Sequence, residues 1–267
     1  MANQTTQTTL FPESRIKFLD NALLINDIEN KILVIADLHI GYEESVVEKS
    51  LFPRIQTHDI ITSLSRIFDK LSKQNIKLDK IIILGDLKHE HGKISEAEWR
   101  ETLYVLDFIS KKAKEIILIK GNHDNILGPI ANKRNIQIIL FYQYDDILFM
   151  HGNKEYKTAF KTKNKKDKAI KILILAHLHP AITLSDEYKK EKYKCFVLGN
   201  YKRKQVYILP SFNPISIGYD LINDNYEKRK DYEFFIIPQN KFKNFNAIIY
   251  NPKEDKAYDF GKLKKLM

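Results

Sequence analysis

Short apolar runs that end in polar or charged residues recur along most of this chain. Runs of roughly four to eight apolar residues bounded by turn signals are typical of strands that are buried on both faces of a sheet. A turn at Asp145-Asp146 should join two of these runs into a hairpin. The predicted strands are 22–28, 31–36, 80–84, 115–119, 136–142, 147–150, 172–176, 195–198, 205–209, 234–237 and 247–250.

Two stretches have the spacing of helices instead. Apolar residues from Ile60 to Leu71 recur at helical intervals and predict a helix over 54–73. Ser95 and Glu98 fit a capping box and predict the start of a second helix, which runs to about Lys112. The first half of the chain therefore alternates strand, helix, strand, helix, strand. Each crossover is long enough for the strands to pair in parallel.

The second half is predicted to be rich in strands, with few helices between them. A βαβ half followed by a β-rich half favours an α/β fold in which two mixed β-sheets pack face to face with helices outside. No linker or internal repeat divides the sequence. We therefore expect one domain over 1–267, with a core at about 20–215 and a β-rich extension at about 218–267 of no assigned purpose.

Composition narrows the class of protein. Apolar residues make up 43% of the chain, as in globular proteins, and no apolar run reaches the roughly 18–20 residues of a membrane span. The polar, uncharged lead-in at 1–9 and the single cysteine, Cys195, lead us to expect a cytoplasmic protein. The net charge of +10 favours polyanionic partners such as nucleic acid, although lysine on an ordinary solvated surface explains it almost as well.

Five of the predicted strands are followed by side chains that can hold a metal ion. Carboxylate, amide and imidazole donors without thiolates suit a borderline or hard divalent ion. Because ligands of α/β sheets bind at the carboxyl ends of the strands, these segments predict a metal site at the rim of a sheet. The segments are Asp37-Leu38-His39, Gly85-Asp86, Gly121-Asn122-His123-Asp124, His151-Gly152-Asn153 and His177-Leu178-His179.

The number of donors indicates two ions. One ion that keeps a water cannot use all of them, whereas two ions about 3.5–4 Å apart, bridged by one carboxylate and one hydroxide, can. Such sites clamp the attacking and leaving oxygens of an in-line displacement at phosphorus, which predicts hydrolysis of a phosphoester. Each segment alone has a plainer explanation, such as a helix cap or a core histidine, and it is their joint order that favours the metal site. The seven donors are Asp37, His39, Asp86, Asn122, His151, His177 and His179.

The sequence resembles the calcineurin-like metallophosphoesterase superfamily over about 30–215, where Asp-x-His, Gly-Asp, Gly-Asn-His-Asp, His-Gly and His-x-His follow one another. Within it, the chain is most similar to the archaeal SbcD-related phosphoesterases, through 36–43 (Ala-Asp-Leu-His-Ile-Gly-Tyr-Glu), 85–89 (Gly-Asp-Leu-Lys-His) and 209–214 (Leu-Pro-Ser-Phe-Asn-Pro). That group is related to nuclease subunits of double-strand-break repair and to ligase-associated DNA-damage-response phosphoesterases. The resemblance implies an αββα sandwich of two sheets flanked by helices, and a role in DNA repair.

The resemblance also implies roles for the candidate residues. A hydroxide that bridges the ions would attack phosphorus, while His123 protonates the leaving oxygen or hydrogen-bonds the phosphoryl group. Asp124 would complete the catalytic motif in a structural or orienting role. The expected metal is Mn²⁺ first, with Fe²⁺, Zn²⁺ or Ni²⁺ as alternatives. One ion would be held by Asp37, His39, Asp86 and His179, and the other by the bridging Asp86 with Asn122, His151 and His177.

Three positions depart from the usual pattern of the superfamily. Ala176 stands where a Gly usually precedes the His-x-His pair, and its methyl group would tighten the loop without removing a ligand. His89 replaces the Asp that orients the catalytic His in the protein-phosphatase branch, which counts against a Ser/Thr phosphatase. The paired arginines that grip phosphate in those enzymes have no match beside the motifs. His89 is itself a candidate for substrate contact, although a plain loop role explains it equally well.

We therefore expect a phosphoesterase that cleaves phosphodiester bonds in single- or double-stranded nucleic acid or in nucleotides. One alternative is a phosphomonoesterase or cyclic-nucleotide phosphodiesterase with the same centre. Others are a non-catalytic scaffold of the same fold and a module that binds nucleic acid through charge alone. A scaffold should have lost ligands, and here all seven are present. Neither the true substrate nor the oligomeric state follows from the sequence.

Overall fold

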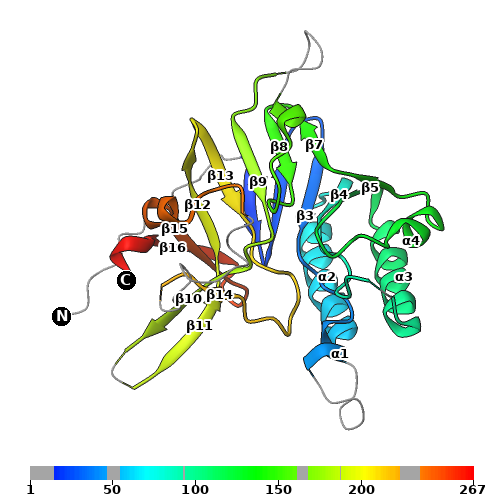
Figure 1. Ribbon diagram of the computed structural model, residues 1–267, viewed down its shortest axis with the longest axis horizontal. Coiled ribbons are helices and arrows are strands. Elements are labelled where there is room, and N and C mark those ends of the chain that lie inside the picture. The colour runs from blue at the N-terminus through cyan, green and yellow to red at the C-terminus, as the bar shows by residue number, and fades with distance from the viewer. Residues whose placement is uncertain (1–14, 47–54, 93, 161–167, 187, 223–234) are drawn as a thin grey trace.

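Two β-sheets built from the apolar runs pack against each other face to face (Figure 1). The computed structural model describes residues 15–46, 55–92, 94–160, 168–186, 188–222 and 235–267. Between the sheets lies a buried apolar layer, to which the first sheet contributes Val34 and Ile82 and the second contributes Phe149 and Ile174. This layer confirms the predicted sandwich.

The first sheet has six strands and carries both long helices on its outer face. In spatial order the strands are β1 (Ile16–Leu19), β2 (Ala22–Asn26), β3 (Lys31–Ile35), β4 (Leu78–Leu84), β5 (Ala113–Ile119) and β6 (Gln137–Ile139). From β3 to β6 neighbouring strands pair in parallel, as the long crossovers predict, whereas β1 and β2 form an antiparallel edge.

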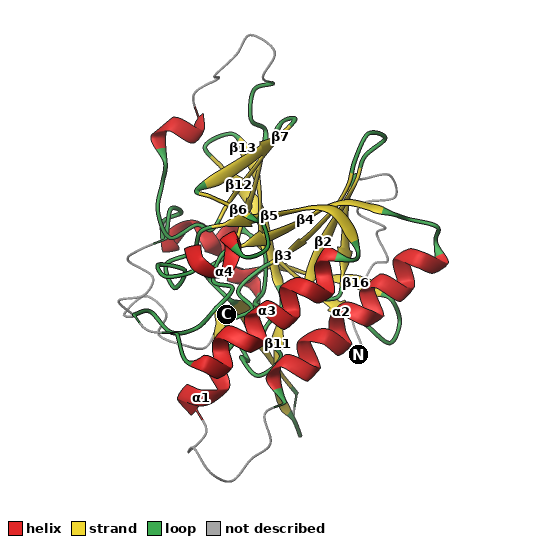
Figure 2. Cartoon of the chain, turned by 90° about the vertical axis from the view of Figure 1, so that its right-hand side faces the viewer, coloured by secondary structure: helices red, strands yellow, loops and turns green. Residues whose placement is uncertain are grey.

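Helices α2 (Gln56–Lys73) and α3 (Glu96–Ser110) cover this sheet, and Figure 2 shows them in front of the strands. Their apolar faces meet the sheet through residues such as Ile60, Leu64 and Leu106, all fully buried. Ser95 caps α3, because its hydroxyl accepts the Glu98 N–H over 3.0 Å. Residue 54, where the predicted helix began, lies outside the described residues. Two short helices, α1 (Tyr42–Val46) and α4 (Gly128–Asn132), were not predicted.

The second sheet has seven strands. In chain order they are β7 (Phe141–Tyr144), β8 (Ile147–Met150), β9 (Ile172–Leu175), β12 (Phe196–Tyr201), β13 (Lys204–Ile208), β15 (Asn246–Asn251) and β16 (Lys256–Lys262). Their spatial order is β16-β15-β12-β13-β9-β8-β7, and only β8, β9 and β13 pair in parallel. A third, unpredicted sheet is formed by β10 (Pro180–Ser185), β11 (Lys190–Lys194) and β14 (Tyr219–Asp220), seen at the lower left of Figure 1.

Two predicted strands are wrong. The run 136–142 is split at Leu140, which is 45% exposed: β6 pairs in the first sheet and β7 in the second, so the chain crosses between sheets there. Only β7 and β8 form the expected hairpin. The second wrong prediction is the strand at 234–237. Residues 235–237 do not form a strand, and residue 234 lies outside the described residues. Phe235 and Ile237 are apolar because they pack on the outer face of the second sheet.

The C-terminal part of the chain completes the second sheet. Strand β15 pairs with β12, and β16 pairs with β15. Phe242, Phe245 and Leu263 are buried against the outer face of the same sheet. The extension, whose purpose the sequence leaves open, therefore closes a core. Within the described residues, no helix combines the length and apolar character needed to span a bilayer.

Candidate metal centre

The structure brings all seven predicted donors together where β3, β4, β5, β8 and β9 end. Six of them form two groups whose ligand atoms lie within 4.8 Å of one another, and the seventh, Asn122, adjoins the second group. These donors come from loops that are far apart in the sequence, as parallel strands with a common rim require. The sequence motifs predicted that these donors would meet at the rim of a sheet, and in the structure they do.

The first group consists of Asp37, His39 and His179. His179 Nε2 lies 3.4 Å from Asp37 Oδ1 and 3.2 Å from His39 Nε2. Among the described residues, Asp37 Oδ1 is buried without a hydrogen-bond partner. A buried, unpaired carboxylate oxygen costs free energy. A cation between these three side chains would satisfy that oxygen, so the donor set fits a metal ion.

The second group consists of Asp86, His151 and His177. His151 Nε2 lies 3.2 Å from Asp86 Oδ2 and 3.0 Å from Asn122 Oδ1. The other ring nitrogen of His151, Nδ1, lies 2.9 Å from the carbonyl oxygen of Leu84. Because a carbonyl only accepts, Nδ1 must carry the proton. Nε2 is then the ring nitrogen that can bind a metal, beside an amide and a carboxylate oxygen.

Asp86 stands between the two groups. Its Oδ2 lies 3.2 Å from His151 in the second group and 3.7 Å from His39 Nε2 in the first. Its other oxygen, Oδ1, accepts the backbone N–H of His123 over 2.9 Å. The carboxylate is thus held by one oxygen and presents the other to both groups, which is the position that a bridging ligand needs.

Protonation in the site also suits metal binding. Burial lowers the pKa of His39 well below its usual range and, together with His151, lowers the pKa of His177 to about 3. Burial alone would raise the pKa of Asp86, but the neighbouring His151 and His39 hold it well below the usual value. Neutral imidazoles and ionised carboxylates are the forms that bind metals. Burial alone would lower the pKa of His151, but the neighbouring Asp86 and Asp37 raise it to about 10.

The backbone at the donors has an uncommon conformation. The φ angles are +52° at Asp37, +45° at His39, +49° at Asp86, +69° at His177 and +46° at His179. All five values lie in the left-handed region, which costs free energy for residues other than glycine. Such conformations persist where the surroundings hold them, and they cluster at functional sites. Something must therefore hold these loops in place.

Asp124 holds the loop that carries Asp86. Its Oδ2 accepts the N–H groups of Asp86 and Gly121, each over 2.8 Å, and its Oδ1 accepts the N–H of Leu87 over 3.1 Å. Both oxygens are thereby used on backbone groups, and the side chain is buried. This geometry is what a structural or orienting role for Asp124 requires.

Three side chains that sequence reasoning did not single out hold the other loops. Gln56 at the start of α2 donates to the carbonyl oxygen of His39 over 2.7 Å and accepts the Gly41 N–H over 3.1 Å. Ser211 donates to the carbonyl oxygen of Asp37 over 2.7 Å. Glu98 accepts two backbone N–H groups beyond Lys88. Ser211 lies in a motif quoted for the family and Glu98 lies in the predicted capping box, where nothing indicated a contact with this loop; Gln56 had no signal in the sequence.

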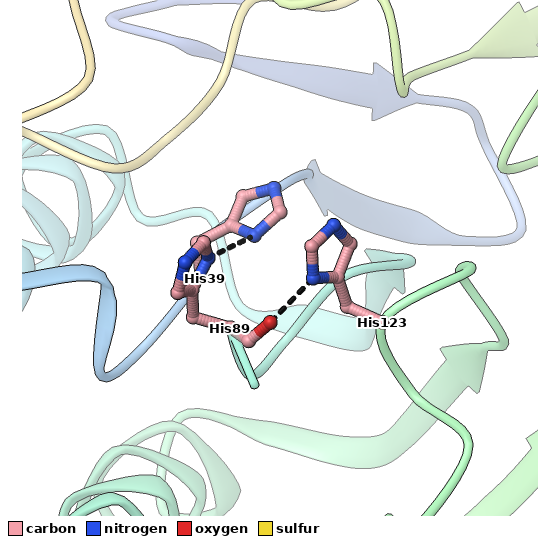
Figure 3. A group of neighbouring side chains, drawn as sticks. All are labelled: His39, His89 and His123. Carbon is pink, nitrogen blue, oxygen red and sulfur yellow. Dashed lines mark hydrogen bonds between the residues drawn. The ribbon is translucent and has the colours of Figure 1, made fainter. Parts of the chain in front are cut away.

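A further group of histidines borders the donors. His123 Nδ1 donates to the carbonyl oxygen of His89, and His89 Nδ1 lies 3.4 Å from His39 Nδ1 (Figure 3). The His91 ring centroid is 3.6 Å from that of His123. Burial lowers the pKa of His123, and the charge of Asp86 partly offsets this effect. The structure thus places His123 and His89 beside the donors, with the His91 ring tilted by 31° against that of His123.

A cavity of about 1060 Å³ lies over the site, lined by His123, His89 and several of the donors. Lys154 and Lys192 also line it. The lysine-rich segment 189–194, most of which is β11, therefore reaches the cavity through Lys192. Lys202 and Lys204 line a separate, smaller pocket, and 161–167 lies outside the described residues.

Fold and site together place a cluster of His and Asp side chains, able to hold metal ions, at the rim of a two-sheet sandwich. The sequence profile of the calcineurin-like phosphoesterases matches residues 30–236, and the chain belongs to that family. This confirms the predicted superfamily. Membership makes a phosphoester the class of substrate and a divalent metal the class of cofactor.

Several solved structures are similar to the chain. Nuclease MPE of Pseudomonas putida superposes with a TM-score of 0.57 and 18% identity, covering 92% of this chain and 94% of that one. The phosphoesterase Yfce of E. coli has a TM-score of 0.36 and 12% identity, covering 86% of this chain and 98% of that one. Vps29 of Entamoeba histolytica, complexed with zinc, has a TM-score of 0.34 and 14% identity, covering 85% of this chain and 96% of that one. No curated protein sequence matches the chain.

Binding of Mn²⁺ should make the chain more resistant to heat. Metal that binds only the folded state at about 100 times its Kd adds roughly 2.7 kcal/mol to the free energy of unfolding. For a chain of this size that corresponds to a rise in Tm of about 5–10 °C. Calorimetry of chelated and Mn²⁺-loaded protein would measure the shift. Equal Tm values for the two forms would contradict a structured metal centre.

Proposed function

We propose that the chain uses two divalent ions, Mn²⁺ foremost, to hydrolyse phosphodiester bonds in nucleic acid or nucleotides. The observation that carries the proposal is a pair of donor groups with Asp86 Oδ2 lying between them, beneath a cavity that has basic residues in its lining. When bound, the ions would neutralise phosphoryl oxygens and make a water available as the nucleophile near neutral pH. One ion would be held by Asp37, His39, Asp86 and His179, and the other by Asp86, Asn122, His151 and His177.

His123 is the residue that we propose as proton donor. It belongs neither to the Asp37 group nor to the Asp86 group, and it lines the cavity. Its ring lies instead in a third group of possible ligands, with His39 and His89. Its Nδ1 proton is engaged by the carbonyl oxygen of His89, so Nε2 is the ring nitrogen available to a substrate. As the bond from phosphorus to the leaving oxygen breaks, protonated His123 would pass its Nε2 proton to that oxygen and become neutral. His89 and His91 would contact the substrate beside it.

Three observations favour a phosphodiester in nucleic acid over a small phosphomonoester. The cavity of about 1060 Å³ slightly exceeds the ~300–1,000 Å³ typical of sites for drug-sized ligands, which are much larger than phosphate. Lys154 and Lys192 bring positive charge to its wall, as a polyanion requires. The fold is also that of a bacterial nuclease. Together with the resemblance to SbcD-related proteins, this supports a role in DNA repair.

A panel of substrates tests the proposal. With Mn²⁺ present, bis-p-nitrophenyl phosphate and single-stranded DNA should be cleaved faster than p-nitrophenyl phosphate, and a chelator should stop all cleavage. A preference for p-nitrophenyl phosphate would instead indicate a phosphomonoesterase. Metal-loaded protein that cleaves none of them would indicate a scaffold. DNA binding without cleavage, unaffected by the chelator and steeply dependent on salt, would indicate binding through charge alone.

A further inference from the structure

The peptide unit between His89 and Glu90 is held from both sides. Its carbonyl oxygen accepts the hydrogen bond from His123 Nδ1, which Figure 3 shows. Its N–H donates to Glu98 Oε1 over 3.0 Å. The same carboxylate oxygen accepts the N–H of His89 over 2.9 Å. A continuous path of hydrogen bonds thus runs from the carboxylate of Glu98 through one peptide unit to the imidazole of His123.

Glu98 is firmly placed behind this loop. It lies in the first turn of α3, its side chain is 1% exposed, and its N–H is bound by the Ser95 hydroxyl. A Cβ atom on Gly41 would come within 3.0 Å of Glu98 Cγ, so the glycine leaves the space that the carboxylate occupies. On the other side of the loop, the buried Lys88 ammonium donates to the carbonyl oxygen of Glu90.

In an ordinary capping box, the glutamate at this position would turn back to the N–H of the capping Ser95. Here its bonds go to His89 and Glu90 instead. A cap is satisfied without a buried carboxylate, and burying one costs free energy unless it accepts hydrogen bonds. The loop that contacts His123 supplies two such bonds to Oε1, while Oε2 is buried without a hydrogen-bond partner among the described residues. The direction of the carboxylate is therefore better explained by that loop than by the helix.

We infer that Glu98 is a positioning residue for His123: it holds and polarises the His89–Glu90 peptide unit, and this unit fixes the orientation and tautomer of the imidazole. The carbonyl can only accept, so His123 must present its Nδ1 proton there and its Nε2 to the cavity. Hydrogen bonds in a chain polarise one another, so a carboxylate on the N–H strengthens the carbonyl as an acceptor. The inference rests on the proposed role of His123 as proton donor.

The positioning role of Glu98 can be tested by measuring kcat and KM of the full, Mn²⁺-loaded chain on two substrates whose leaving groups differ in basicity. The substrates are the p-nitrophenyl and phenyl esters of thymidine 5′-phosphate, because phenolate needs protonation on departure far more than p-nitrophenolate does. Glu98→Ala should lower kcat about 100-fold on the phenyl ester but no more than about threefold on the p-nitrophenyl ester, with KM unchanged. Glu96→Ala, an exposed glutamate in the same helical turn, is the matched control and should match the wild type.

A second variant guards against a folding defect in Glu98→Ala. Glu98→Gln keeps an oxygen that accepts both N–H groups but removes the charge, so it should fold and lower kcat on the phenyl ester only, by about tenfold. Because Glu98 acts through His123, neither substitution should slow the His123→Ala enzyme further. An equal loss on both esters, or a further loss in the His123→Ala background, would overturn the inference.

A spectroscopic measurement separates this inference from the proposed function. In metal-free protein, the Nδ1 proton of His123 should give a hydrogen-bonded NMR resonance that is absent in His123→Ala and shifts in Glu98→Gln. If the wild type cleaves neither ester, the proposed function fails, and the resonance still tests the path from Glu98. If the resonance does not respond to Glu98→Gln, the path itself is refuted, whatever the activity.

Discussion

Replacing Asp86 with Asn should abolish turnover while leaving the fold intact. Asp86 Oδ2 faces both donor groups, at 3.2 Å from His151 and 3.7 Å from His39. An amide has nearly the same shape but no charge to attract two cations. Substitutions behind a metal ligand already cost about 10–100-fold in affinity or activity, so loss of the shared ligand should lower kcat/KM by more than about 100-fold.

The measurement pairs kcat/KM on bis-p-nitrophenyl phosphate with the metal content of the protein after Mn²⁺ loading. Asp69→Asn, at an exposed position on α2, is the control and should retain both metal and turnover. Asp86→Asn protein that keeps its metal and cleaves at the wild-type rate would remove the basis of the proposed function. Unchanged binding of nucleic acid by this variant would be compatible with the proposal, since the basic residues of the cavity remain.

The first sheet could be predicted because its strands are marked locally. Each parallel strand is a continuous apolar run, and a helix of clear periodicity joins it to the next. The third sheet lacks such marks: β11 (Lys190–Lys194) reads Lys-Glu-Lys-Tyr-Lys and forms only because β10 lies beside it. The crossing at Leu140 was missed for the same reason, since no local pattern shows that one apolar run serves two sheets.

The donors could be predicted because metal chemistry restricts their residue types. The side chains that hold their loops are not restricted in this way. Gln56 on α2 binds the loop after β3, and this depends on how α2 lies on the sheet. Glu98 fits a capping box by sequence, yet its carboxylate binds the loop after β4. His89 stands at the position of the Asp that orients the catalytic His in the protein-phosphatase branch. The sequence therefore shows no orienting carboxylate for His123. The structure shows that the backbone carbonyl of His89 accepts the His123 Nδ1 proton instead.

Gly121→Ala should remove the metal centre through a single methyl group. A Cβ atom on Gly121 would overlap the carboxylate and the backbone nitrogen of Asp86. Neither can retreat easily, because Asp86 Oδ1 is bound to the His123 N–H and its backbone N–H is bound to Asp124. We expect the free energy of unfolding to fall by about 1–3 kcal/mol, as for other overpacked sites. Turnover should fall more than about 100-fold, because Asp86 is displaced from both donor groups.

Urea denaturation, metal analysis and kcat/KM together check this prediction. Gly92→Ala is the matched control: it lies in the loop next to His91, and a Cβ atom there would have nothing within 4 Å. Its stability and turnover should equal those of the wild type. If Gly121→Ala bound Mn²⁺ as tightly as the wild type, Asp86 would have to tolerate displacement, and it would not be the shared ligand. A loss of stability with metal binding retained would show that the close packing of Gly121 supports the fold and not the centre.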